Sequence, residues 1–415
     1  MASWTPYSLD PSASTVPVNF GAPGLGRGSA IVKVGSLLYY VTTKQFVPSS
    51  PTYELFIKKS TDGGITWTTK YTGPFAAYSF TVAAVGTVIY ILCDDYNVSS
   101  DIIVKRWDTI TDTLLSDGTP SGNQVDSNGG IASAVWPDGK ILLAYVNDSS
   151  GELVCDCYDP VGDFWAGEST LDTSGFVYDL AIDSVSITAF VLAFDSSGNF
   201  CVFPITAPNT GFSPGLLNTP NSDFDESCIG NVTISNGDVV VSYLDPPTQT
   251  STQRPGELHL QRASISTAPA FSAAEDVEIS LVDPQAIFDF SFSGPNAWAV
   301  IDDGAGTLYA IYPIMTDPQE LSTTQVTLVY KTSTTPGTWS AYATVWSGPF
   351  PSSLLLIKLL LVPGGIGILA VDIDPTLGYG GTGLAVLYLA PPFASQNNYV
   401  SAGGALAGPG SYASA

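Results

Sequence analysis

The sequence predicts an all-β protein built as a single β-propeller, with seven four-stranded blades favoured and six or eight left open. Three observations support this class. The 415 residues include 40 Gly and 30 Pro, with 45% hydrophobic and only 12% charged residues, a composition that buries a large core and turns often. Short apolar stretches recur at intervals of about fifty residues, the period of propeller blades. The last unit also lacks a fourth strand of its own, and a matching segment lies at the N-terminus.

Second and third strands can be assigned in every unit from short apolar runs bounded by turn residues. Second strands are expected at 37–41, 88–92, 141–146, 189–194, 239–244, 297–301 and 366–373. Third strands are expected at 53–59, 102–107, 152–158, 199–205, 257–263, 307–313 and 383–389. Each series has seven members, and this favours seven blades.

The sixth unit departs from the pattern. Residues 325–331 read as a further strand between Thr307 and Trp339, one more than the unit should contain. The unit therefore either carries an insertion or the blade count is wrong by one, so six and eight blades stay open.

The fourth strands indicate how the ring closes. Only six follow their own third strands, beginning near Trp67, Thr109, Trp165, Phe212, Phe271 and Trp339. The N-terminal segment Ser-Trp-Thr-Pro-Tyr-Ser-Leu is similar to the segments at 66–71 and 338–342. We expect residues 3–10 to form the outer strand of the last blade, which removes the exposed edges of an open array. Residues 1–393 then form the propeller, and 394–415, rich in Ala, Gly and Ser, a tail that is disordered or docks on another surface.

Charge and composition exclude several classes of function. A formal net charge of -25 on 13 basic residues leaves no basic patch for nucleic acid or an anionic membrane. No signal peptide or membrane-inserting run is recognisable. The single histidine, His259, excludes a multi-histidine metal site. The cysteines are expected to be buried free thiols, since no paired CxxC zinc pattern is present: Cys93, Cys155, Cys157, Cys201 and Cys228.

Residues 60–67, Ser-Thr-Asp-Gly-Gly-Ile-Thr-Trp, form the most specific local pattern. Two glycines permit positive φ, the aspartate can accept backbone N–H bonds, and the tryptophan can fold back as an apolar plug. The stretch resembles the Asp-box of sialidases and other BNR-repeat proteins, pattern S-x-D-x-G-x-T-W, which it matches at Ser60, Asp62, Gly64, Thr66 and Trp67. A degenerate copy at 332–339 has Thr334 in place of the aspartate. The resemblance implies a turn between third and fourth strands of a blade, on the face away from any active site.

The resemblance to sialidases extends to one further residue. In that family an arginine before the first apolar strand binds the substrate carboxylate together with two more arginines, and a Tyr/Glu pair and an Asp perform the chemistry. Arg27 stands at the corresponding place, but without the Ile-Pro that follows it in the family. Only Arg106, Arg254 and Arg262 are left to complete a clamp, and none lies in a family-like segment. A carboxylate-binding clamp is therefore not expected.

Acidic or amide residues follow most of the expected second strands and should gather around the mouth of the central channel. Such a rim could hold Ca²⁺, which takes oxygen ligands, or accept hydrogen bonds from sugar hydroxyls. Ordinary turn chemistry is the alternative interpretation, and a carboxyl pair could also serve a glycosidase. The rim residues are Asp94, Asp95, Asn147, Asp148, Asp195, Asp245, Asp302, Asp303, Asp372 and Asp374, of which Asp302, Asp303, Asp372 and Asp374 are the candidate metal ligands.

These features favour a non-catalytic propeller for binding or assembly, of the kind found as a structural or receptor-binding, glycan-binding protein on a virion or phage surface. Its expected partners are other structural subunits and surface glycans, its expected location is extracellular or on a virion, and no cofactor other than Ca²⁺ is considered. The alternative is a sialidase-like or other glycoside hydrolase or lyase with its site at the channel mouth. Ligand contacts are expected from loops after the second strands and from arginines, namely Arg27, Phe46, Tyr96, Arg254 and Tyr379.

Overall fold

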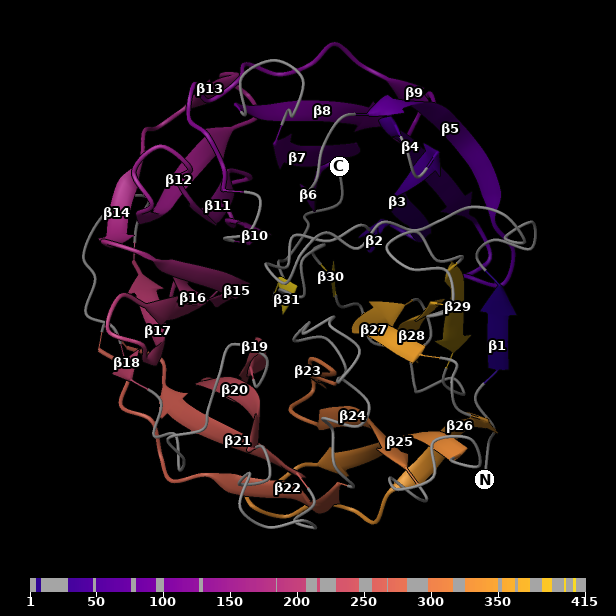
Figure 1. The fold of residues 1–415 in the computed structure, drawn as a ribbon, viewed down its shortest axis with the longest axis vertical. Helices are drawn as coiled ribbons and strands as arrows, with labels where there is room; N and C mark the ends of the chain where they lie inside the picture. Colours follow the sequence, from indigo (N-terminus) through magenta and orange to yellow (C-terminus); the bar gives the residue numbers. More distant parts are fainter. Residues whose placement is uncertain are drawn as a thin grey trace.

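Seven antiparallel sheets surround a central axis in the structure, a computed structural model of the whole chain (Figure 1). The prediction of an all-β propeller with seven blades is confirmed. The structure describes residues 5–8, 29–47, 50–75, 80–94, 101–126, 130–183, 185–206, 215–216, 229–245, 256–266, 268–281, 298–315, 325–349, 353–362, 365–373, 383–389, 399–400 and 406–407.

Blades 1 to 4 follow one another along the chain, each with its first strand nearest the axis (Figure 1). Blade 1 contains β2 (Ser29–Val34), β3 (Leu37–Val47), β4 (Ser50–Ser60) and β5 (Thr68–Phe75). Blade 2 contains β6 (Phe80–Val85), β7 (Val88–Asp94), β8 (Ile102–Asp108) and β9 (Thr113–Leu114). Blade 3 contains β10 (Ile131–Val135), β11 (Ile141–Val146), β12 (Leu153–Asp159), β13 (Phe164–Trp165) and β14 (Ser169–Asp172). Blade 4 contains β15 (Gly175–Asp183), β16 (Thr188–Asp195), β17 (Phe200–Ile205) and β18 (Gly215–Leu216).

Blades 5 to 7 complete the ring. Blade 5 contains β19 (Ile229–Ser235), β20 (Asp238–Asp245), β21 (Gly256–Ser264) and β22 (Glu275–Leu281). Blade 6 contains β23 (Ala299–Asp302), β24 (Leu308–Met315), β25 (Gln325–Ser333) and β26 (Ala343–Pro349). Blade 7 contains β27 (Ser353–Val362), β28 (Gly365–Ile373), β29 (Gly383–Leu389) and the N-terminal β1 (Thr5–Ser8).

The sixth unit needed one correction. The stretch expected as its second strand is the innermost strand β23, and the stretch expected as its third is the second strand β24. The extra strand, β25, is then simply the third, so neither an insertion nor a different blade count is needed. The error arose because the short β23 is buried at every position and ends in an Asp-rich turn, so it reads like a second strand.

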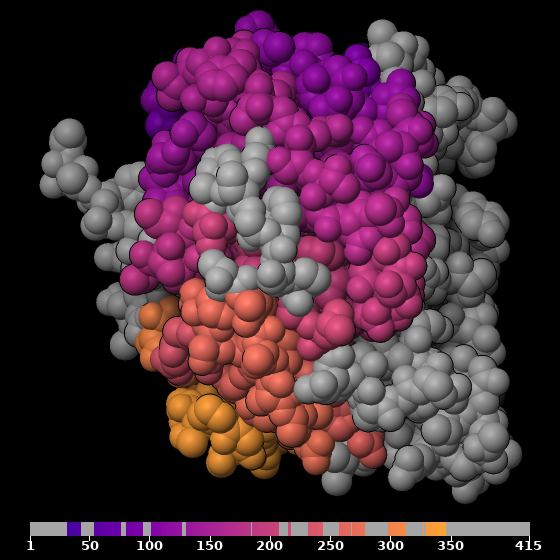
Figure 2. All heavy atoms as spheres, turned by 90° about the vertical axis from the view of Figure 1, so that its left-hand side faces the viewer, coloured from indigo at the N-terminus to yellow at the C-terminus, as the bar shows by residue number. Residues whose placement is uncertain are grey.

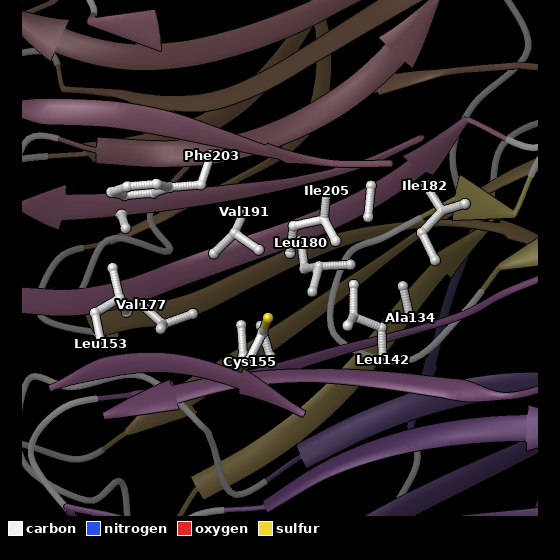
Figure 3. Packing of buried hydrophobic residues seen from close by; sticks show 14 of the residues in the cluster. Ala134, Leu142, Leu153, Cys155, Val177, Leu180, Ile182, Val191, Phe203 and Ile205 are labelled. Atoms are coloured by element: carbon white, nitrogen blue, oxygen red, sulfur yellow. The ribbon is translucent and has the colours of Figure 1, made fainter. Parts of the chain in front are cut away.

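The contact between two successive blades is here called a seam and numbered by its two blades. Every seam from 1/2 to 5/6 buries its own apolar cluster. In seam 3/4, strands of both blades bring Leu142, Cys155, Val191 and Phe203 together, and each is at most 1% exposed (Figure 3). Blades 2 to 5 are therefore covered by apolar neighbours on both faces, and this burial is the main source of their stability.

The described cysteines agree with the sequence-based prediction. Cys93, Cys155, Cys157 and Cys201 are free and buried. Burial raises the pKa of the Cys155 and Cys157 thiols to about 12. Among the described residues, no helix has the length and apolarity required to span a membrane.

Two short strands from the C-terminal segment lie near the axis (Figure 1). β31 (Leu406–Ala407) pairs in parallel with β15, with Ala407 opposite Ile182, and β30 (Tyr399–Val400) pairs with β31. The backbone of these residues therefore extends the inner edge of blade 4. The predicted boundary at residue 393 stays a prediction.

Strand β1 closes the ring, as the sequence predicted. It pairs with β29 from Thr5 opposite Leu389 to Ser8 opposite Val386, and so forms the outermost strand of blade 7. The first and last described strands of the propeller are thereby hydrogen-bonded in one sheet, which spares β29 an open edge.

We predict that deleting residues 1–10 lowers the thermal unfolding midpoint by roughly 5–10 °C, since about four strand hydrogen bonds at about 1 kcal/mol each are lost and an edge is exposed. Differential scanning calorimetry measures the shift, and deletion of residues 1–3 alone, which leaves β1 intact, is the matched control. An unchanged midpoint in the longer deletion would show that β1 does not hold the ring closed.

Candidate functional site

Most of the contact residues expected from the sequence lie outside the described parts of the chain. Of the expected ligands, Phe46 in β3 and Asp372 in β28 are defined only by their backbone positions. The remaining expected residues lie outside the described residues and stay predictions: Arg27, Tyr96, Arg254, Tyr379 and Asp374.

Asp302 and Asp303 do not lie where the rim hypothesis placed them. They occupy the turn between the first and second strands of blade 6, whereas the rim was assembled from residues that follow second strands. Asp302 Oδ1 accepts the N–H of Gly304 and its Oδ2 accepts Ser235 Oγ at 2.5 Å. Asp303 Oδ1 accepts the Ala305 N–H. Turn bonds therefore occupy these carboxylates, and burial raises the pKa of Asp302.

Turn chemistry also accounts for Asn147 and Asp195 of the expected rim. Asn147 Oδ1 accepts the N–H groups of Ser149 and Ser150, and Asp195 Oδ1 accepts those of Ser197 and Asn199. These are the Asx-type hairpin bonds expected of such sequences. Across the described ranges, no group of three or more His, Cys, Asp or Glu side chains is placed to hold a metal ion.

The turn at residues 60–67 joins β4 to β5 and satisfies its own polar groups. Ser60 Oγ accepts the Gly64 N–H at 2.8 Å, and Asp62 accepts both the N–H and the hydroxyl of Thr66, at 2.9 and 2.6 Å. Trp67 Nε1 donates to the Gly64 carbonyl at 2.9 Å. The turn lies between the third and fourth strands of blade 1, as the resemblance implied. The indole N–H of its tryptophan already has an acceptor within the turn.

A cation recurs at one register position of the third strands. Lys59, Arg106 and Arg262 each lie opposite the third residue of the second strand in blades 1, 2 and 5. Lys59 and Arg106 reach an aspartate of the following blade, whereas Arg262 pairs with Glu275 of its own blade, which in turn bonds to a turn of the following blade. The outer ends of seams 1/2, 2/3 and 5/6 can therefore be compared directly.

Seams 1/2 and 2/3 are closed by an aspartate from the following blade. Lys59 Nζ lies 2.9 Å from Asp112 and Arg106 lies 3.6 Å from Asp163. Both aspartates have a φ of 53° and end the matching turns Asp108–Asp112 and Asp159–Asp163. The Tyr158 hydrogen bond, helped by the Thr119 N–H, lowers the pKa of Asp163. This D-x-x-x-D repeat, 51 residues apart in the sequence, is the signal that the sequence analysis missed.

Seam 5/6 carries the same cation but a different partner. Arg262 Nε donates to Glu275 Oε1 at 2.6 Å, and Glu275 comes from the fourth strand of the same blade. The facing turn of blade 6, residues 334–338, contributes no acid and instead donates the Gly337 N–H to Glu275 Oε2 at 2.8 Å. The degenerate turn thus lacks its own aspartate and is braced by a carboxylate from the neighbouring blade.

The position held by Glu275 in blade 5 is held by a glycine in blade 2. In blade 2 the Leu115 N–H donates to the Arg106 carbonyl, and Gly118, three residues later, donates its N–H to the Val104 carbonyl. In blade 5 the Ser272 N–H donates to the Arg262 carbonyl, and Glu275, three residues later, pairs with Leu260. Gly118 therefore holds the position in blade 2 that Glu275 holds in blade 5. A Cβ on Gly118 would lie 2.5 Å from the Tyr158 hydroxyl, so only glycine fits there. Seam 5/6 accommodates a full glutamate side chain at the same place.

The tryptophans at the start of the fourth strands differ in the same way. Trp165 Nε1 donates to the Thr119 carbonyl across seam 2/3 at 2.9 Å. Trp339 holds the equivalent place in blade 6. The residue after Trp165, Ala166, donates its N–H to the Cys157 carbonyl, and the residue after Trp339, Ser340, donates its N–H to the matching Thr332 carbonyl of the third strand. Trp339 packs on the apolar cluster of seam 5/6, and its Nε1 is buried without an acceptor among the described residues, as are those of Trp107 and Trp136. An indole N–H left in this way costs free energy unless an acceptor is supplied.

A second ion pair follows along seam 5/6. Lys331 Nζ lies 3.1 Å from Glu278 Oε2 and donates to the Val277 carbonyl, and Tyr312 donates its hydroxyl to the same carboxylate at 2.9 Å. Burial first, and then the charge of Glu278, raises the pKa of Tyr312, and the nearby Tyr342 phenol adds to the shift. Tyr342 is 53% exposed. In Figure 2 the salmon surface of blade 5 meets the orange surface of blade 6.

Another carboxylate cluster lies at seam 2/3, with Asp156 buried and Glu168 exposed. Tyr145 donates its hydroxyl to Glu168, and Asn147 Nδ2 lies 2.9 Å from the same carboxylate. Asp156 accepts the N–H groups of Cys157 and Gly167. A Tyr/Glu pair beside an Asp matches the residue types of sialidase chemistry, but Tyr145 and Asp156 are both 0% exposed and no substrate can reach them. The cluster is structural.

Asp156 makes stability depend on pH. Burial raises its pKa to about 6, above the roughly 3.9 of an unfolded chain. The folded protein therefore binds the proton more tightly, and ionisation of Asp156 opposes folding increasingly as pH rises from about 4 through about 6. We predict that at pH 8 the free energy of unfolding of Asp156→Asn exceeds that of the unsubstituted protein by on the order of 2–3 kcal/mol, and that the two proteins are about equally stable at pH 4. Denaturant unfolding at both pH values measures the difference. A variant no more stable than the unsubstituted protein at pH 8 would contradict this.

The remaining candidates from the sequence do not converge. Arg106 and Arg262 lie on opposite sides of the ring, each paired to its own acid, so they do not form one clamp (Figure 1). His259 is 5% exposed, lies over the Tyr243 ring and is flanked by Glu257 and Asp276, at 3.3 and 3.1 Å. It is a buried sheet residue, as its alternating strand suggested.

Comparison with known proteins supports the fold alone. A scan against protein-family models finds no match, and a search of curated proteins finds no relative. The BP39L lectin from Burkholderia pseudomallei is similar in structure, with a TM-score of 0.55 and 12% identity over 95% of this chain and 98% of the lectin. A mutant Trypanosoma rangeli sialidase with trans-sialidase activity matches at 0.45 and 11% over 93% and 60%, and the polysaccharide lyase Uly1 at 0.39 and 10% over 74% and 88%.

Proposed function

We propose that the protein is a non-catalytic β-propeller that binds neutral carbohydrate at the outer end of seam 5/6. The observation that carries the proposal is the Arg262–Glu275 pair at the described seam end where a glutamate replaces a packed glycine, with the Trp339 ring of the facing blade packed on the same seam. The likeness to a lectin along nearly the whole of both chains supports the fold for this use.

The chemistry of these side chains suits hydroxyl-rich ligands. A guanidinium donates and a carboxylate accepts charge-assisted hydrogen bonds, so the pair can contact neighbouring sugar hydroxyls at once. The indole N–H supplies a further donor, and its ring supplies an apolar face for the C–H side of a pyranose. The proposal is supported by seam 2/3, where the equivalent Arg106 and Trp165 donate to neutral hydroxyl and carbonyl oxygens of Ser116 and Thr119.

The charge balance favours neutral over acidic sugars. Arg262 is matched by Glu275 and Lys331 by Glu278, so no net positive charge is left to attract a carboxylate. The formal net charge of -25 repels anionic ligands over longer distances. These points argue against a sialoside as ligand.

Binding without turnover fits the groups at this seam. Glycoside hydrolysis needs two carboxyls flanking one bond, with one able to act as acid. At seam 5/6 both glutamates are tied to cations, and Glu275 also accepts the Gly337 N–H. We keep an extracellular or virion surface as the proposed location, where such a propeller would attach to glycans and to neighbouring subunits.

Titration with glycans found on a neutral-glycan array tests the site. Arg262→Gln should weaken binding by about tenfold or more, because a charge-assisted hydrogen bond contributes roughly 1.5–3 kcal/mol. Trp339→Phe, which removes only the N–H and part of the ring, should weaken it by about threefold to tenfold. Isothermal titration calorimetry measures both.

Trp165→Phe is the matched control, since it changes the equivalent tryptophan in a closed seam and should leave affinity unchanged. Full affinity in both seam 5/6 variants would place the site elsewhere. Release of sugar from labelled glycosides by the unsubstituted protein would overturn the non-catalytic proposal.

A further inference from the structure

We propose that the inner edge of blade 4 is a strand-accepting surface, and that its partner is the C-terminal tail, residues 394–415, of a second copy of this chain. Within one copy the chain's own tail takes this place, through β30 and β31 (Figure 1). The inference is independent of the carbohydrate site at seam 5/6 and concerns how copies of the protein associate.

The tail lies across the axis of the ring. Its strand β31 pairs in parallel with β15, the innermost strand of blade 4, and comes within 8 Å of β10 in blade 3, measured between Cα atoms. Its strand β30 comes within the same distance of β2 in blade 1 and β27 in blade 7. The tail therefore lies against the innermost strands of four blades. An innermost strand has an edge toward the axis, and such an edge offers backbone N–H and C=O groups to a further strand.

The length of its innermost strand suits blade 4 to this role. β15 has nine residues, whereas β10 and β19 in the neighbouring blades have five and seven. Among the described residues, β31 pairs with β15 at one register position, Ile182 opposite Ala407. So short a pairing is held by few hydrogen bonds, and each adds little net stability. The tail can therefore leave its own acceptor without unfolding of the ring.

The sequence of the tail suits passage between copies. Residues 375–415 contain no charged side chain, in a chain whose formal net charge is -25. Two copies repel each other through their charged surfaces, and an uncharged segment is the part that this repulsion affects least. The tail of a second copy also forms the same backbone bonds with β15 as the chain's own tail. Identical bonds in both arrangements are the condition for the exchange of an element between copies.

Protein concentration decides which tail occupies the acceptor. A short tether such as residues 390–398 holds a tail near its own acceptor at a local concentration on the order of millimolar. Exchange is therefore rare in dilute solution and becomes substantial as the protein concentration approaches that value.

Disulfide trapping in full-length chains tests the exchange. One chain carries Ile182→Cys and the other Ala407→Cys, since paired residues of adjacent strands lie close enough for a disulfide. We expect oxidation of the mixture to give cross-linked dimers whose yield rises about tenfold or more between roughly 10 μM and 1 mM protein. Non-reducing electrophoresis measures the yield, and mass spectrometry of the linked peptides identifies the bond.

A control mixture carries Val185→Cys in place of Ile182→Cys. Val185 follows β15 and is 86% exposed, so it meets other chains by chance more often than Ile182, which is 2% exposed. Equal dimer yields from the two mixtures would overturn the proposal. So would a double variant, with Ile182→Cys and Ala407→Cys in one chain, that closes within the chain while the mixture gives no dimer at about 1 mM.

The unsubstituted protein provides a test that does not depend on these variants. A fluorescent peptide of residues 394–415 should bind it, and the same peptide with Ala407→Pro should bind about tenfold or more weakly. Proline removes a backbone donor and is excluded from the interior of a sheet, where β31 lies between β15 and β30. Fluorescence anisotropy at up to about 1 mM protein measures both affinities. Absence of binding, or equal affinity of the two peptides, would overturn the proposal.

Discussion

The structure depends on the burial of apolar faces between successive blades. Each described seam from 1/2 to 5/6 contains its own cluster of side chains that are almost fully removed from water. A four-stranded sheet with two apolar faces is not stable alone, so every blade needs both neighbours and the ring must close. The β1–β29 pairing supplies that closure, and the polar chemistry of the protein is displaced to the ends and outer edges of the seams.

Those outer edges are where the blades differ. Lys59, Arg106 and Arg262 hold one register position, and in the first two cases an aspartate from the next blade neutralises the cation. In seam 5/6 the next blade has lost that acid, and Glu275 takes over from within the same blade. A glutamate there occupies the place that a packed glycine holds in blade 2. The loss of one acid in a turn is thus offset by a partner from within the blade, and the apolar cluster of the seam is retained.

Sequence reasoning predicted what is locally encoded. The seven blades, the closing strand and the bonds of the turn at 60–67 follow from apolar runs and turn residues a few positions apart. The seams could not be predicted in this way, because Lys59 and Asp112 are 53 residues apart, one blade along the chain. Asp302 was misplaced for a related reason, since the turn after a first strand and the turn after a second strand use the same Asx chemistry. Only the register of the sheets distinguishes them.

The same reasoning explains why fold likeness alone cannot assign the activity of this chain. A propeller seam is held by apolar burial that many sequences can supply, so the BP39L lectin shares the fold at only 12% sequence identity. What one seam binds is decided by the few polar residues that the apolar contacts leave at its edge. In seam 5/6 these residues are the Arg262–Glu275 and Lys331–Glu278 pairs, whose side chains are held by packing and by bonds to neighbouring backbone groups.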